Sequence, residues 1–213
     1  MKKSFKYWKR EMLYQEIGLS LQPNMPFLED WLSGTALIES DELAFLEKLR
    51  QKAHKYIDSW NEAELQTKFI SKIVDWVNFD LPEYRCNSFE ERYVSATVQH
   101  LTLYGFADWM VSEGETEPTH PYFFMHEYKP EGEKQIDGRG QLLALMLATQ
   151  ALNKDNYPIY GCFIHGRMWF FVVLNGLNYE ISRAYISTQI NDLQEIMKIL
   201  KKQKEMIIER IKK

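Results

Sequence analysis

The sequence has few cysteines, no zinc-type histidine spacing and no apolar run of membrane-spanning length. Two cysteines, Cys86 and Cys162, are too few for a disulfide framework or a cysteine zinc site, so we expect both to be small buried side chains. The five histidines show no paired spacing typical of zinc. The longest strongly apolar segment, residues 142–152, is too short to cross a bilayer. The basic N-terminus is not followed by the apolar stretch of a signal peptide, and we therefore expect a cytoplasmic protein with no membrane span.

Charge is distributed unevenly along the chain. The formal net charge is −4, yet residues 1–10 carry five Lys or Arg and no acid. Residues 193–213 carry seven Lys or Arg against three Glu, which leaves the middle of the chain strongly acidic. A basic end is suited to holding a polyanion, but charged termini are also commonly just solvated. Charge alone therefore does not argue for a nucleic-acid partner.

The first part of the chain has helical patterns. Residues 40–57 repeat apolar side chains at helical spacing, after a break at residues 21–26 that contains two prolines. We expect residues 1–58 to form a helical N-terminal extension and residues 59–213 to form the main domain. In residues 60–82, Asn61 is a candidate N-cap, and Glu64 lies at the edge of the apolar face of the helix predicted there.

Strand patterns dominate the centre of the chain. Residues 91–112 mix β-branched and aromatic side chains, which predicts two strands or one long bent strand, and residues 121–129 predict a further short strand. Residues 141–153 are apolar on nearly every side, which is typical of a helix buried between layers. Residues 158–176 predict a hairpin. This order predicts an α/β sandwich with a mixed central sheet flanked by helices.

The stretch PYFFMHEYKP, residues 121–130, places a carboxylate and an ammonium at the end of an apolar strand. Alternation predicts that Phe123, Met125, Glu127 and Lys129 share one face, with His126 packed on the other. The preceding strand repeats this arrangement, with Asp108 expected between core residues Phe106 and Met110.

Two carboxylates on adjacent strands need a compensating charge, because burying a lone carboxylate costs several kcal/mol. Asp108 and Glu127 would supply the hard oxygen ligands that suit Mg²⁺, and Lys129 could then orient or help to deprotonate an attacking water. The alternative is a surface ion pair at a strand end, with Asp108 in a bend. The E-x-K tripeptide alone favours that alternative, because the pattern is common.

The ordered combination of motifs resembles the PD-(D/E)XK phosphodiesterase superfamily, the restriction-endonuclease-like fold, and within it the bacterial families of uncharacterised nuclease-like proteins. The resemblance covers about residues 60–175. It rests on Glu64 in NEAELQTKFI, Asp108 in YGFADWMV, Glu127 and Lys129 in MHEYK, and Gln141 in GRGQLLALM. The proline that names the motif is absent before Asp108, where the sequence has Ala.

By this resemblance, Asp108 and Glu127 are expected to bind the metal and Lys129 to be the catalytic lysine. Glu64 would be a further ligand or a water-positioning acid, and Gln141 would orient the lysine or the phosphate. The resemblance implies a Mg²⁺-dependent endonuclease, with Mn²⁺ as a substitute and DNA as the expected substrate. The alternative is a catalytically silent nuclease-fold module that binds nucleic acid or assembles with protein.

The last predicted helix, from about residue 189 to the end, has an apolar stripe with lysines opposite. It would either cap the domain or pair with a second copy in a homodimer.

Overall fold

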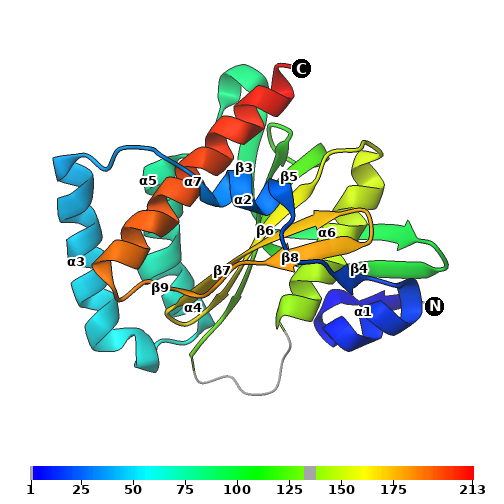
Figure 1. The fold of residues 1–213 in the computed structure, drawn as a ribbon, viewed down its shortest axis with the longest axis horizontal. Helices are drawn as coiled ribbons and strands as arrows, with labels where there is room; N and C mark the ends of the chain where they lie inside the picture. Colours follow the sequence, from blue (N-terminus) through cyan, green and yellow to red (C-terminus); the bar gives the residue numbers. More distant parts are fainter. Residues whose placement is uncertain (1, 132–137) are drawn as a thin grey trace.

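The computed structural model describes residues 2–131 and 138–213. Within them, nine strands form one mixed sheet with helices on both faces (Figure 1). The predicted fold class, an α/β sandwich with a mixed central sheet flanked by helices, is confirmed.

The strands of this sheet differ greatly in length. In chain order they are β1 (Lys2–Ser4), β2 (Ser20–Leu21), β3 (Cys86–Val98), β4 (Leu101–Glu113), β5 (Thr119–Lys129), β6 (Ile159–His165), β7 (Met168–Asn175), β8 (Asn178–Ile181) and β9 (Tyr185–Ile186). Their order across the sheet is β1-β4-β5-β6-β7-β8-β2, with β3 also paired to β4 and β9 to β7. The β3, β4 and β5 strands are antiparallel neighbours, whereas β5 and β6 are parallel.

A parallel pair requires a crossover, and a helix connects β5 to β6. The helices are α1 (Arg10–Ile17), α2 (Pro26–Leu32), α3 (Ser40–Tyr56), α4 (Glu62–Leu65), α5 (Ser71–Val77), α6 (Gly138–Asn153) and α7 (Ile190–Ile211). A π-helical turn, Gln66–Ile70, joins α4 to α5, and short 3₁₀ turns cover Phe5–Tyr7, Ile57–Ser59 and Pro82–Tyr84.

Two apolar cores lie on opposite faces of the sheet. One core contains α6 and the first turns of the chain; Leu142 to Thr149 of α6 are all buried, as predicted for a helix between layers. The other core lies under α2, α3, α5 and α7. At its centre Trp31 contacts three aromatic rings edge-on and donates a hydrogen bond to the carbonyl of Ile199 at 3.1 Å. Cys86 and Cys162 are free and buried, as expected.

Residues 1–58 contribute strands as well as the expected helices. The β1 strand pairs in parallel with β4, and β2 pairs in parallel with β8. Phe5 and Trp8 are buried in the core around α6, and Trp31 in the other core. The division of the chain at residue 59 stays a prediction.

Two expectations about strand faces are wrong. Phe123 lies in the same core as its neighbour Phe124, because the β4–β5 register shifts after Val111 and breaks the alternation there. Phe106 was expected in the core beside Asp108, but it is 61% exposed. Elsewhere in β5 the alternation holds, and His126 is fully buried on the face opposite Met125.

In the part of the chain that the structure describes, no helix has both the length and the apolar character needed to cross a membrane.

A substitution at Gly140 would test the close packing of α6 against the backbone around Trp8. A Cβ at this position would lie 2.4 Å from the carbonyl oxygen of Trp8, which is backbone and has little room to move. We expect Gly140→Ala to lower the free energy of unfolding by about 2 kcal/mol in chemical denaturation, despite the better helix propensity of alanine. The control Gly18→Ala meets no atom within 4 Å and has only its positive φ to disfavour it, so it should cost about 1 kcal/mol, less than Gly140→Ala.

Candidate metal and catalytic site

The β4 and β5 strands separate at Asp108. Their pairing ends with Trp109 opposite His126. One step further, the backbone N–H of Tyr128 donates to Asp108 Oδ2 at 2.9 Å instead of to a main-chain carbonyl. The carboxylate therefore occupies the space between two diverging strands.

The β3 strand is also irregular opposite Asp108. The β3–β4 ladder pairs the residues on both sides but skips Glu91, which has a φ of +49°. In addition, Phe89 and Val94 belong to the same core although an even alternation would place them on opposite faces. Such irregularities re-aim side chains in a sheet. Here they bring Glu91 close enough to Asp108 to raise the pKa of its carboxyl group.

Glu127 and Lys129 lie at the end of β5 on the α6 side of the sheet. Glu127 has no exposed surface and Lys129 is 7% exposed. Their Nζ and Oε1 atoms are 2.8 Å apart, as an ion pair. Neither oxygen of Glu127 accepts a well-aligned hydrogen bond from any residue that the structure describes. One oxygen of this buried carboxylate thus has no protein partner, and the other has only the lysine.

The predicted acid of the preceding helix, Glu64, is not part of this cluster. Its side chain closes a capping box with Asn61 and pairs with Lys68. Glu62, two residues earlier, instead places its Oε2 3.4 Å from Lys129 Nζ. Residues two apart on a helix face different directions, and Asn at the N-cap with Glu three positions later is a known capping pattern. That pattern was the signal by which Glu64 could have been assigned to the cap.

Gln141 lies in the first turn of α6 and is half-buried. Among the described residues it makes no hydrogen bond to Lys129. The structure therefore brings together Asp108, Glu127 and Lys129 of the predicted set, adds Glu62, and leaves Glu64 outside.

The electrostatics of the cluster are dominated by burial. Burial raises the pKa of Asp108 to about 6; Lys129 opposes this shift, whereas Glu62 and Glu91 add to it. Burial, and after it the charge of Asp108, also raises the pKa of Glu127 well above its usual range. For Lys129 burial alone would lower the pKa, but Glu127 and Asp108 raise it overall, so the ammonium stays charged. Three carboxylates, Asp108, Glu127 and Glu62, thus act on one cation.

This donor set fits a hard divalent cation. Carboxylate oxygens are the ligands that Mg²⁺ and Mn²⁺ prefer, and the imidazole of His126 points into the opposite core, where burial lowers its pKa to about 3. Within residues 2–131 and 138–213, no group of three or more carboxylate, imidazole or thiol side chains is arranged to hold a metal by itself. A cation bound by Asp108 and Glu127 would therefore keep water or substrate ligands, which is usual for Mg²⁺.

The turn between β6 and β7 makes hydrogen bonds and ion pairs that fix the backbone on both sides of the carboxylate cluster. Arg167 donates from Nε to both oxygens of Glu131, at 2.8 and 3.0 Å, and also pairs with Asp58. The N–H of Gly166 donates to the carbonyl of Lys129 at 2.8 Å. Because Glu131 follows Lys129 by two residues and Asp58 precedes Glu62 by four, this turn holds the strand and the helix of the site together.

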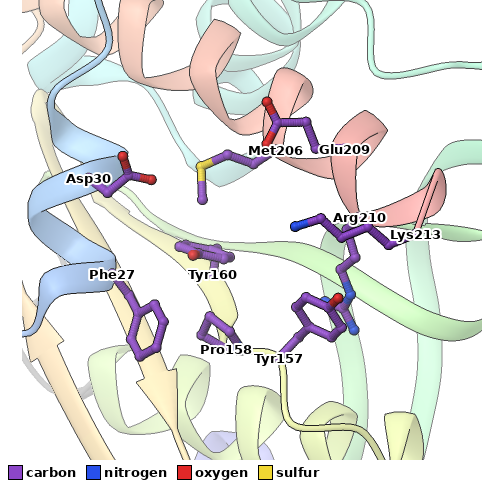
Figure 2. A pocket seen from close by; sticks show the side chains of 9 residues that line it. All are labelled: Phe27, Asp30, Tyr157, Pro158, Tyr160, Met206, Glu209, Arg210 and Lys213. Carbon is purple, nitrogen blue, oxygen red and sulfur yellow. The ribbon is translucent and has the colours of Figure 1, made fainter.

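A pocket of about 170 Å³ lies elsewhere, between α2, the start of β6 and the end of α7 (Figure 2). Figure 2 shows the rings of Phe27, Tyr157 and Tyr160 around it. Arg210 at its edge pairs with Asp155 at 2.6 Å. None of the buried polar atoms without a partner belongs to this pocket, so its lining offers no unmet binding capacity comparable to that of Glu127.

Comparison with known proteins gives little further information. No protein-family model matches the chain, and no curated protein sequence matches it. Among solved structures, the DrdV–DNA complex determined by cryo-electron microscopy is similar with a TM-score of 0.44 and 14% sequence identity. The match covers 74% of this chain and 14% of that chain.

The site can be distinguished from an ordinary buried ion pair by its effect on stability. The pKa of Asp108 in the folded state is above its unfolded value, so ionisation costs stability; this cost grows as pH rises above the unfolded pKa and is fully present above the folded pKa of about 6. We expect Asp108→Asn, which still accepts from Tyr128, to stabilise the metal-free protein by roughly 2 kcal/mol at pH 8. The gain should be small at pH 4, where the folded carboxyl is protonated and pH has only just reached the unfolded pKa, so that little of the cost has developed. Chemical denaturation at the two pH values measures it.

The control is Glu42→Gln, which removes the charge of a buried carboxylate that is paired with Lys201 at 2.6 Å, far along the chain from Asp108. This pair has the geometry of a structural ion pair, and the substitution should destabilise the protein. If Asp108→Asn were as destabilising as Glu42→Gln, the cluster would be structural.

Proposed function

We propose that the protein is a metal-dependent nuclease of the PD-(D/E)XK superfamily that hydrolyses phosphodiester bonds in DNA. The observation that carries the proposal is the buried carboxylate of Glu127, which has no second partner among residues 2–131 and 138–213 and lies beside Asp108 and Lys129 where two strands diverge. In a purely structural role Lys129 would balance one negative charge, but an oxygen of Glu127 would stay buried without a partner among the described residues and the charge of Asp108 would add to the cost.

The element order supports the same proposal. An acid-bearing helix, three antiparallel strands, a buried helix and a parallel strand follow one another in residues 62–165. The E-x-K strand is the third of the three, and Asp108 lies on its neighbour. These are the positions that the resemblance requires for Asp108, Glu127 and Lys129, whereas the role expected of Glu64 passes to Glu62.

In this proposal Asp108 and Glu127 hold Mg²⁺, or Mn²⁺ in its place, which when bound neutralises charge on the phosphate and makes a bound water more acidic. Lys129 provides a fixed positive charge beside the scissile phosphate and donates to an oxygen that becomes more negative during attack. Glu62 has a half-exposed side chain next to Lys129 Nζ, where it can accept a proton from water at the mouth of the site.

A second candidate function is a catalytically silent module with the same fold. The observation that favours it is that the described residues supply no group of three metal-ligating side chains. In that case Lys129 and Glu127 would simply neutralise each other in the interior. Such a module would bind nucleic acid or protein without needing a metal.

Metal binding separates the two functions. We expect calorimetry to detect Mg²⁺ and Mn²⁺ binding by the wild type, and Asp108→Asn or Glu127→Gln to abolish it because each removes a ligand. Both metals should also raise the melting temperature of the wild type and not that of these variants. Lys129→Met should reduce metal-dependent cleavage of plasmid and single-stranded DNA by at least roughly 100-fold. No metal binding at millimolar cation would reject the nuclease and leave the silent module.

Glu62 and Glu64 form a matched pair for testing the helix acid. We expect Glu62→Gln to lower cleavage about tenfold or more, because it removes a charge next to Lys129. Glu64→Gln should leave cleavage nearly unchanged, because Gln also closes a capping box, and should cost less than about 1 kcal/mol of stability. Initial cleavage rates and denaturation curves of both variants measure this. The reverse pattern would return the catalytic role to Glu64.

A further inference from the structure

The hairpin of β3 and β4 has one buried and one open face. The buried face contributes to the core around α6 through Val94, Ala96, Leu101 and Leu103. On the open face three aromatic rings contact one another, which we call the aromatic strip: Tyr93, Tyr104 and Phe106. Ring centroids are 5.6 Å apart for Tyr93 and Phe106 and 6.4 Å apart for Tyr93 and Tyr104. Tyr93 is 52% and Phe106 61% exposed, which is unusual for large rings in a sheet.

The N-terminal strand adds a cation to this face. In the β1–β4 pairing Lys2 is opposite Thr102, and its Nζ lies 4.9 Å from the centroid of the Tyr104 ring. The β1, β3 and β4 positions that share the open face by register carry no carboxylate; they are Lys2, Ser4, Tyr93, Ser95, Thr97, Thr102, Tyr104 and Phe106. In a chain with 30 acidic residues, this row of rings, hydroxyls and one lysine, with its nearest β3 carboxylate at Glu91 next to the candidate site, suits a polyanion that has aromatic groups.

The aromatic strip is continuous with the candidate site. Phe106 precedes Asp108 by two residues in β4, about 7 Å along an extended strand, and Tyr93 follows Glu91 by two residues in β3. In Figure 1 the green hairpin projects to the right, beyond α6 and close to the N-terminus. A chain lying on the hairpin would therefore reach Asp108 in the gap where β4 and β5 separate, and Glu127 lies beyond this gap on the α6 side of the sheet.

We propose that the open face of the β3–β4 hairpin, with β1, binds single-stranded DNA and leads it to Asp108 and Glu127. This inference rests on the proposed nuclease function and specifies its substrate as unpaired strands. Exposed rings stack on bases of any sequence, but only on bases that are not already stacked within a duplex. Lys2 and the hydroxyls of Ser95 and Thr97 would contact phosphates between the stacked bases.

The test is binding in EDTA, where no cleavage occurs. Fluorescence anisotropy would compare a labelled oligothymidine with a duplex of the same length, using the wild type and the double variant Tyr93→Ala, Phe106→Ala. The wild type should prefer the single strand, and the double variant should bind it at least about tenfold more weakly, because stacking on one ring is typically worth about 1–3 kcal/mol. Phe106→Trp, which keeps a ring for stacking, should retain binding.

The matched control is Tyr56→Ala. Tyr56 is also an exposed ring with a lysine, Lys55, over it at 5.0 Å, but it lies at the end of α3 in the other helical layer. Its removal should change affinity by less than about twofold. Circular dichroism melting of all variants would show that each is folded.

The inference is overturned if the wild type binds no oligothymidine, if it prefers duplex, or if the double variant binds as tightly as the wild type. A concentration-dependent dimer that the double variant loses, without oligonucleotide binding, would assign the face to a second copy and would also overturn it. Strip-dependent binding by a wild type that never cleaves DNA would instead support this inference and reject the nuclease. The two failures are therefore distinguishable.

Discussion

The site depends on the cost of holding an ionised carboxylate inside the protein. The side chain of Glu127 has no exposed surface, and in the part of the chain that the structure describes its one partner is the ammonium of Lys129. Asp108 adds a second negative charge instead of relieving the first. The surrounding elements serve this arrangement: β4 and β5 separate so that Asp108 can replace a backbone carbonyl, and the β6–β7 turn braces the strand end through the carbonyl of Lys129. A local arrangement that lowers the stability of the fold, such as these buried carboxylates, is typical of a site that binds a cation or a substrate.

Much of the fold could be predicted because its signals are local. The apolar residues of α6 and the alternation around Met125 identify their elements without knowledge of the rest of the chain. The hairpin at Gly166 and the Asn61 cap were also visible as turn and capping chemistry. The strands β1 and β2 were not, because segments of two or three residues have no period to detect and form only through partners far along the chain.

The site was predictable only in part, for reasons of direction and register. The shared face of Glu127 and Lys129 follows from strand alternation, which holds at this end of β5. Alternation fails around Asp108 in β4, where Phe106 is exposed, so the geometry of Asp108 could not be predicted from it. The choice between Glu62 and Glu64 depends on the exact residue at which the helix begins. Helix boundaries are the feature that a sequence pattern predicts least reliably. The irregularity at Glu91 depends on the pairing of three strands, which the local sequence does not encode. No glycine stands near Glu91 in the sequence to indicate a positive φ there.

The hydrogen bond from Trp31 to the carbonyl of Ile199 joins residues 168 positions apart. Trp31 also packs against Phe124 and Phe171, so the core on this face is assembled from the beginning, middle and end of the chain. During synthesis, the early helices emerge long before α7 can cover them. Contacts of such sequence separation make folding slow, and the incomplete chain exposes a large aromatic surface until its last helix leaves the ribosome. The protein therefore completes this core only after translation of α7, and this interval is when it most needs protection from aggregation.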